Sequence, residues 1–238
     1  MPPFTGALPY FDSAHLPNPP PAYVAWLDVM GVGATMGRSL DITANFVMKL
    51  HAALLEALTQ DHELYPLMDG AYIATATRAA MTSYLDVVLT RMADLFVSTP
   101  ENHHRFLVKG ALAFGPTVRG STIPDAASQT LADNPEYRAR LLLGQPMVQA
   151  YHSENLAPPF GIYVHESART FSAAGERPFT QVWWNWGMQA PPPGLKTELM
   201  VCLGQYFDWC KERSTRIQYP SHRIDEHRRM AIEYFMAI

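Results

Sequence analysis

Apolar residues recur along this chain in two patterns, as short unbroken runs and as longer stretches with a helical period. Short runs are typical of buried strands, and they cover 22–28, 64–67, 71–76, 106–114 and 161–165. Apolar positions at helical spacing predict helices near 38–58, 80–97, 146–156, 195–213 and 221–237. Asp69-Gly70, between the second and third runs, is typical of a hairpin. This order predicts an α+β fold with a ferredoxin-like βαββαβ core, an added αβ unit and a C-terminal helical extension.

Two segments of different composition flank the predicted sheet domain, which we place at 22–170. Residues 1–21 are rich in proline and are expected to form an extended arm on the surface. Residues 171–238 include the cluster Trp183-Trp184-Asn185-Trp186 and are expected to pack on the domain or on a dimer interface. Inside the domain, residues 117–140 are polar and rich in turn formers, which is typical of a functional or mobile segment.

Composition argues against several classes of protein. The net charge is −4, with acidic and basic residues interspersed, so we expect no general nucleic-acid binding. No apolar run reaches about 18 residues, so no membrane span is expected, and the N-terminus lacks a signal-peptide pattern. Cys202 and Cys210 would lie roughly 12 Å apart on a helix, which is too far for a disulfide. Unbridged cysteines fit a reducing compartment, so a cytoplasmic location is expected.

Two aspartates stand at the ends of predicted strands. Asp28 closes the first apolar run, and Asp69 lies in the predicted hairpin. Taken alone, Asp69 is more typical of a turn, and Asp28 of a helix cap or a loop. A buried carboxylate is costly unless a positive group pairs with it, and Mg²⁺ or Mn²⁺ suits paired aspartates. The pair therefore predicts a two-metal phosphate site, and the loop Met30–Gly33 is expected to offer backbone N–H groups to phosphates.

Four segments resemble, in order, motifs of the class III nucleotidyl cyclase catalytic domain. They are Trp26 to Val32, Tyr65 to Tyr72, Val108 to Gly115 and Gly144 to Glu154, followed by the strand Ile162-Tyr163-Val164. The resemblance implies that Asp28, Asp69 and the carbonyl of Val29 hold two Mg²⁺ or Mn²⁺ ions on a nucleoside triphosphate. It implies attack of the ribose 3′-hydroxyl on the α-phosphorus and loss of pyrophosphate. The β- and γ-phosphates would bind the backbone of Met30, Gly31, Val32 and Gly33.

The chain departs from the family pattern at four positions. Tyr65 stands where the family has a base-reading lysine, and Leu141 where it has a base-reading aspartate. Val148 and His152 stand where it has the asparagine and arginine that stabilise the transition state. Tyr65 is also typical of an ordinary strand, and His152 of a surface or interface helix. Basic residues that are candidates for the missing arginine's role are Arg38, Lys109, Arg119, Arg138 and Arg140.

A bulky aromatic residue at position 65 narrows the base pocket and favours a pyrimidine over a purine. This pattern is similar to the pyrimidine cyclases of Pycsar anti-phage systems, which are homodimers that make cyclic UMP or cyclic CMP. The resemblance implies conversion of UTP to 3′,5′-cyclic UMP in antiviral defence, with a separate effector that binds the product. It also implies active sites between subunits, where helix 144–156 of one chain faces Asp28 and Asp69 of the other. The alternatives are a cytidylate cyclase, a purine cyclase and a catalytically silent binding module.

Overall fold

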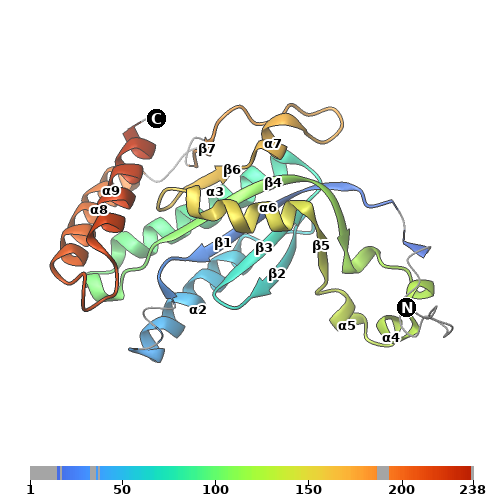
Figure 1. The fold of residues 1–238 in the computed structure, drawn as a ribbon, viewed down its shortest axis with the longest axis horizontal. Coiled ribbons are helices and arrows are strands. Elements are labelled where there is room, and N and C mark those ends of the chain that lie inside the picture. Colours follow the sequence, from blue (N-terminus) through green and yellow to red (C-terminus); the bar gives the residue numbers. More distant parts are fainter. Residues whose placement is uncertain (1–14, 17, 33–35, 37, 187–192, 237–238) are drawn as a thin grey trace, which may run out of the picture.

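The computed structural model describes residues 15–16, 18–32, 36, 38–186 and 193–236 (Figure 1). Gly33 and most of the expected arm 1–21 lie outside the described residues. The described part is an α+β structure, in which a mixed sheet carries helices on both faces and continues into a helical C-terminal part. The predicted fold class is confirmed.

The described residues form a sheet of seven strands in the order β2-β3-β1-β4-β6-β7, with β5 paired to β4. The strands are β1 (Pro21–Val29), β2 (Glu63–Leu67), β3 (Gly70–Thr75), β4 (Val108–Arg119), β5 (Leu142–Gly144), β6 (Ile162–Val164) and β7 (Trp183–Trp184). β1 pairs antiparallel with both β3 and β4, which gives the first four strands the ferredoxin-like arrangement. The added unit places β6 parallel to β4.

Helices cover the two faces of the sheet unequally. The long helices α2 (Leu40–Glu56) and α3 (Arg78–Ser98) pack on one face, and α6 (Gln145–Ser153) packs on the other (Figure 1). The remaining α-helices are α4 (Gln129–Ala132), α5 (Pro135–Arg138), α7 (Glu166–Thr170), α8 (Leu195–Glu212) and α9 (Ser221–Met236). The hydroxyl of Ser39 accepts a hydrogen bond from the N–H of Ile42, which explains why α2 begins at Leu40.

Alternate residues of β1 point to opposite faces of the sheet, as the pleat requires. The larger core, against α2 and α3, takes Tyr23, Ala25, Leu27 and Val29. The smaller core, under α6, takes Val24 and Trp26 together with Tyr65 and Tyr72. Asp28 follows Trp26 by two residues, so its side chain shares the α6 face of the sheet.

The C-terminal residues extend the sheet and its core. β7 pairs with β6, and the indole N–H of Trp186 donates to the carbonyl of Phe160 at 2.6 Å. The hydroxyl of Tyr234 in α9 donates to the carbonyl of Trp184 at 2.8 Å. α8 contacts α3 through the rings of Phe96 and Tyr206, whose centroids are 5.6 Å apart. Trp184 and Trp186 of the tryptophan cluster are buried in the larger core.

One strand differs from its predicted bounds. Gly115-Pro116 was expected to end the fourth strand, but β4 continues to Arg119. Pro116 stands opposite Pro21, the first residue of β1, so its missing N–H comes where that ladder already ends. Beyond this point β4 pairs with β5 instead, from Thr117 opposite Gly144 to Arg119 opposite Leu142.

Two predictions from composition can be compared with the described residues. Cys202 and Cys210 are free cysteines, as predicted, and burial raises the pKa of the Cys210 thiol to about 12. Among the described residues, no helix combines the length and the apolar character needed to cross a bilayer.

Candidate metal and phosphate site

Asp28 lies near the end of β1, in the middle of the sheet. Its Cα stands opposite that of Gly70 on β3 and that of Lys109 on β4. A Cβ on residue 70 would lie 2.7 Å from the ring of Trp26 and would also overlap the carbonyl of Leu27. Glycine at position 70 therefore lets the hairpin approach β1 closely.

Asp69 is placed by the turn that precedes Gly70. β2 and β3 are joined by Met68 and Asp69, and Met68 has a φ of 52°, in the left-handed region that non-glycine residues rarely adopt. Asp69 is half-buried, and its charge acts on Asp28 across the β1–β3 pair. The two predicted aspartates thus come together at one end of the sheet.

The surroundings of Asp28 disfavour the charged form of its carboxyl group. Burial and, less strongly, the carboxylates of Asp69 and Glu154 together raise its pKa to about 7. The N–H of Val29 and the ammonium of Lys109 act in the opposite direction but do not offset these effects. Within the described part of the chain, the buried Oδ1 of Asp28 has no hydrogen-bond partner. A buried carboxylate oxygen without a partner is the expected signature of a cation site.

Glu154 reaches this site from the 3₁₀ turn Glu154–Leu156, which follows α6. Its Oε1 lies 3.0 Å from Nζ of Lys109, and the two side chains are only 16% and 8% exposed. Lys109 was one candidate for the missing arginine, and the structure shows it already paired with a carboxylate. The sequence indicated no role for Glu154, although it ends the fourth cyclase-like segment.

The donors at this site fit a hard divalent cation such as Mg²⁺ or Mn²⁺. Oxygen ligands from Asp28 and Asp69 would hold it, together with the carbonyl of Val29 that the resemblance implies. A different set, Glu101, His103 and His104, is the one among the described residues whose three ligand atoms all lie within 4.8 Å of one another. An ion at Asp28 and Asp69 would therefore complete its shell with backbone, substrate or water oxygens.

The loop after β1 is the expected phosphate-binding segment. The N–H of Met30 donates to the carbonyl of Leu107 at 2.8 Å, so this amide is already bound within the fold. Gly31 has a φ of 79°, which favours glycine, and Met30 and Gly31 both line a large cavity. Val32 is buried. The phosphate-binding role of this loop stays a prediction.

The two residues expected to read the base, Tyr65 and Leu141, lie outside the cavity that Met30 and Gly31 line. Tyr65 is 5% exposed within the smaller core, and its hydroxyl donates to the carboxylate of Glu63. Burial and this carboxylate raise the pKa of Tyr65. Glu63 also pairs with Arg119 at 2.8 Å, which holds the tyrosine in place. The N–H and carbonyl of Leu141 bond to the backbone of Arg138 and Gly120. Neither Tyr65 nor Leu141 lines the cavity.

Val148 and His152, one turn apart on α6, are both exposed on its surface. Beside them, the exposed ring of Tyr151 has its centroid 5.6 Å from that of Trp26. Among the described residues, neither Val148 nor His152 lines the cavity beside Lys109. This position leaves both side chains available to another molecule.

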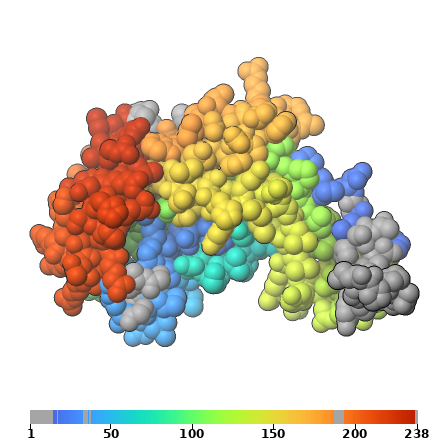
Figure 2. Space-filling view, viewed as in Figure 1, coloured from blue at the N-terminus to red at the C-terminus, as the bar shows by residue number. Residues whose placement is uncertain are grey.

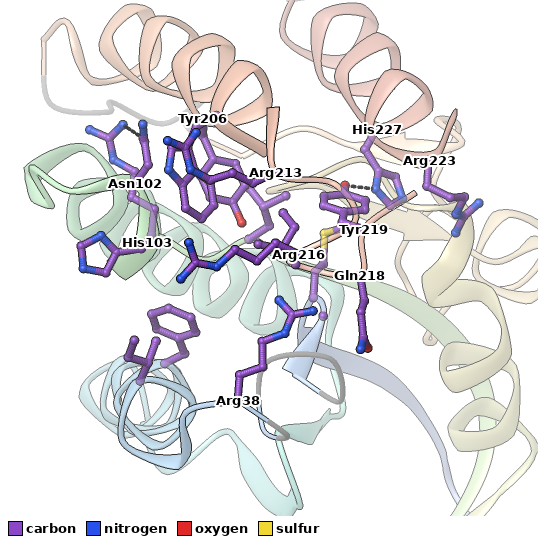
Figure 3. A pocket seen from close by; sticks show the side chains of 18 of the residues that line it. Arg38, Asn102, His103, Tyr206, Arg213, Arg216, Gln218, Tyr219, Arg223 and His227 are labelled. Atoms are coloured by element: carbon purple, nitrogen blue, oxygen red, sulfur yellow. Dashed lines mark hydrogen bonds between the residues drawn. The ribbon is translucent and has the colours of Figure 1, made fainter. Parts of the chain in front are cut away.

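A cavity of about 810 Å³ adjoins the aspartate site, between the sheet domain and the loop that joins α8 to α9 (Figure 3). Arg38 and Lys109 line it, whereas Arg119 and Arg138 are paired outside it with Glu63 and Asp125. Four further arginines that the sequence did not single out for this site also line it, namely Arg105, Arg213, Arg216 and Arg223. Three basic residues within 211–216, at the end of a predicted helix, were the available signal.

Comparisons with known proteins found similar structures only. No protein-family model and no curated protein matches the chain. A bacterial light-regulated adenylyl cyclase is 11% identical, with 59% of this chain and 71% of that chain aligned at a TM-score of 0.44. An adenylate cyclase of Trypanosoma brucei in its monomeric state is 12% identical, covering 68% and 80% at a TM-score of 0.48. An EAL/GGDEF domain protein of M. capsulatus is 13% identical, covering 64% and 90% at a TM-score of 0.39.

Proposed function

We propose that this protein is a nucleotidyl cyclase, a phosphorus–oxygen lyase that converts a nucleoside triphosphate to a 3′,5′-cyclic monophosphate and pyrophosphate. The observation that carries the proposal is the buried, unpartnered carboxylate oxygen of Asp28, set beside Asp69 and next to a cavity rich in arginine. Such a site suits a divalent cation together with a polyphosphate. The order of the four cyclase-like segments adds to it, because they bring Asp28, Asp69, Lys109 and Glu154 to one end of the sheet.

In this proposal, Asp28, Asp69 and the carbonyl of Val29 hold two Mg²⁺ or Mn²⁺ ions. Bound there, the ions would withdraw charge from the phosphates and favour loss of the proton from the ribose 3′-hydroxyl. The O3′–Pα bond forms as the bond from Pα to the bridging oxygen of pyrophosphate breaks. Gly31 and the adjoining loop orient the phosphate chain, and the Lys109–Glu154 pair fixes the wall beside Asp28.

For the base, we propose a pyrimidine, with UTP preferred and cyclic UMP as the product. The choice depends on Tyr65, which is bulkier at its tip than an extended lysine. Glu63 and Arg119 hold its ring in the smaller core, outside the arginine-lined cavity, so the base would bind on the α6 face of the sheet. A CTP-specific enzyme and a purine cyclase are the alternatives, because uracil, cytosine and purines differ at edges that a single side chain can read. A role in antiviral defence, with a separate effector for the cyclic nucleotide, belongs to the same proposal.

We also propose that the enzyme acts as a homodimer. α6 exposes Val148, 43% accessible, and Tyr151, 48% accessible, next to His152. Apolar side chains exposed together on one helix suit a subunit interface better than water. In the dimer, this helix would face Asp28 and Asp69 of the partner.

The deciding experiment incubates the full chain with each of the four NTPs and Mn²⁺ or Mg²⁺, and identifies products by mass spectrometry. We expect one cyclic nucleotide to dominate, and Asp28→Ala and Asp69→Ala to abolish it. Asp61→Ala, an exposed turn aspartate, is the matched control and should keep full turnover. Near wild-type turnover by either site variant would refute the metal assignment, whereas a dominant purine product would refute only the pyrimidine choice.

A catalytically silent binding module is the second candidate, since Val148 and His152 replace residues that stabilise the transition state. Titration calorimetry separates it from the enzyme. Metal-dependent binding of a nucleotide without any turnover would favour the silent module, and turnover would exclude it.

A further inference from the structure

The cavity beside the aspartate site is built by two distant parts of the chain. One wall comes from the loop after β1, the start of α2 and the start of β4. The other comes from the second half of α8, the loop after it and the first half of α9 (Figure 3). In the space-filling view, the C-terminal helices and the segment that holds α2 lie next to each other at one end of the molecule (Figure 2). A volume of about 810 Å³ is within the range of small-molecule sites.

Most of the charged residues that line the cavity are basic. The basic lining residues are Arg38, Arg105, Lys109, Arg213, Arg216 and Arg223. The acidic residue among the described lining residues is Glu154, and Lys109 already binds it at 3.0 Å. Because the whole chain has a net charge of −4, this cluster is a local excess of positive charge. A concave site lined by one sign of charge concentrates ligands of the opposite sign.

Arg105 is a buried cation whose hydrogen bonds all go to neutral groups. Arg105 is 7% exposed. Its guanidinium carbon lies over the ring of Phe96, 5.3 Å from the ring centroid. Its guanidinium donates to the carbonyl of Thr99, to Oδ1 of Asn102 and to Sγ of Cys202. No carboxylate of the described residues forms an ion pair with it. Burying a guanidinium without an anion is costly, so the cavity is electrostatically incomplete.

Arg38 and Arg216 enter the cavity from opposite walls (Figure 3). Both residues are exposed, and neither makes a hydrogen bond or an ion pair with another described residue. Arg213 and Arg223 are different, because each pairs with a neighbouring glutamate, Glu212 or Glu226, at 2.7 Å. Arg38 and Arg216 are therefore the guanidinium groups best placed to bind an incoming anion.

We propose that this cavity binds a polyphosphate chain, and that Arg216 and Arg105 bind it together with Arg38 of the same subunit. We assign this polyphosphate to the triphosphate tail of the substrate, an assignment that rests on the proposed cyclase function. Asp28 and Asp69 do not line the cavity themselves, but Met30 and Gly31 do. Lys109, which also lines it, stands opposite Asp28, so the cavity borders the aspartate site. The C-terminal part of the same subunit thus supplies, through Arg216, the positive charge that Val148 and His152 do not provide. A separate ligand with a polyphosphate chain would present the same chemistry.

The first test measures binding of inorganic tripolyphosphate to the full chain by calorimetry, in EDTA and at low salt. We expect Arg216→Ala and Arg38→Ala each to weaken binding about tenfold, because each loses a charge-assisted contact. The control is Arg229→Ala, an exposed arginine on α9 that pairs with Glu233 and does not line the cavity. Unchanged binding in both cavity variants, or an equal loss in the control, would overturn the proposal. Arg216 is exposed, so its replacement should not disturb folding, and a thermal melt verifies this.

The second test separates the two sources of the polyphosphate. If the cavity holds the substrate's own tail, tripolyphosphate competes with the NTP, and Arg216→Ala raises KM about tenfold while kcat changes less. Non-competitive inhibition with an unchanged KM would overturn the assignment to the substrate and leave a separate polyphosphate ligand. If no NTP is turned over but tripolyphosphate binding still depends on Arg216, the proposed function fails and the polyphosphate site stands.

Discussion

Replacing Asp28 by asparagine should make the metal-free protein more stable. In the folded chain the pKa of Asp28 is about 7, against a reference value of 3.8, because of burial and the carboxylates of Asp69 and Glu154. At about 1.4 kcal/mol per pKa unit, ionising this group in the fold at pH 8 costs about 4 kcal/mol. Asp28→Asn removes the charge and keeps an oxygen that can accept from the N–H of Val29. We therefore expect a gain of about 3 to 4 kcal/mol at pH 8.

The sign of the pH dependence follows from the raised pKa. Between about pH 4 and 7 the folded state keeps a proton on Asp28 that the unfolded chain has lost, so the contribution of Asp28 to wild-type stability falls as pH rises. The gain in Asp28→Asn should then be small at pH 4 and complete above pH 7. Urea denaturation in EDTA at both pH values measures it, with Asp61→Asn as the exposed control. An equal gain at both pH values, or a loss at pH 8, would refute the reasoning.

Three further predictions follow from contacts near the site. Glu154→Gln leaves Lys109 buried without its carboxylate and should lower the free energy of unfolding in urea by about 3 kcal/mol. A Lys109→Met, Glu154→Leu double variant should largely restore it, and an unaffected single variant would contradict this. Gly70→Ala forces a Cβ against Trp26 and should lower stability by about 3 kcal/mol and reduce turnover; a wild-type melting temperature would show that the hairpin can shift. Burial lowers the pKa of His227 to about 4, so the contribution of His227 to stability should fall by about 3 kcal/mol from pH 6.5 to 4. Melting curves should show this as a wild-type stability that falls, relative to His227→Gln, as the pH is lowered; a difference that stays constant with pH would contradict it.

The sequence predicted the parts of the fold that local periodicity determines. Alternating or continuous apolar runs identified β1 to β4, and helical spacing identified α2, α3 and α6, because each signal extends over several residues. β7 escaped prediction because two residues carry no pattern, and it forms only through its pairing with β6. β4 was predicted too short, since its last residues pair with β5, a strand of three residues that the sequence did not reveal.

The candidate site also contains residues whose roles the sequence predicted and residues whose roles it could not predict. Asp28 and Asp69 could be paired from the sequence because a strand end and a hairpin tip become neighbours once β1 lies beside β3. The roles of Glu154 and Arg105 could not be predicted, because their burial depends on how α6 and α8 pack. Arg216 lies far along the chain from Arg38, so their meeting is a property of the tertiary structure alone.

The two electrostatic imbalances in this molecule are complementary. Asp28 lacks a cation, and next to it a cavity that contains Arg105, Arg216 and Arg38 lacks an anion. The chain does not pair these groups directly, although attraction between opposite charges in a partly buried setting would favour it. A fold that keeps them apart stores both costs until a ligand with a positive and a negative part arrives. A divalent cation bound to a polyphosphate has that composition, so one ligand would offset both imbalances, whereas a bare phosphate or a free metal ion would each offset only one.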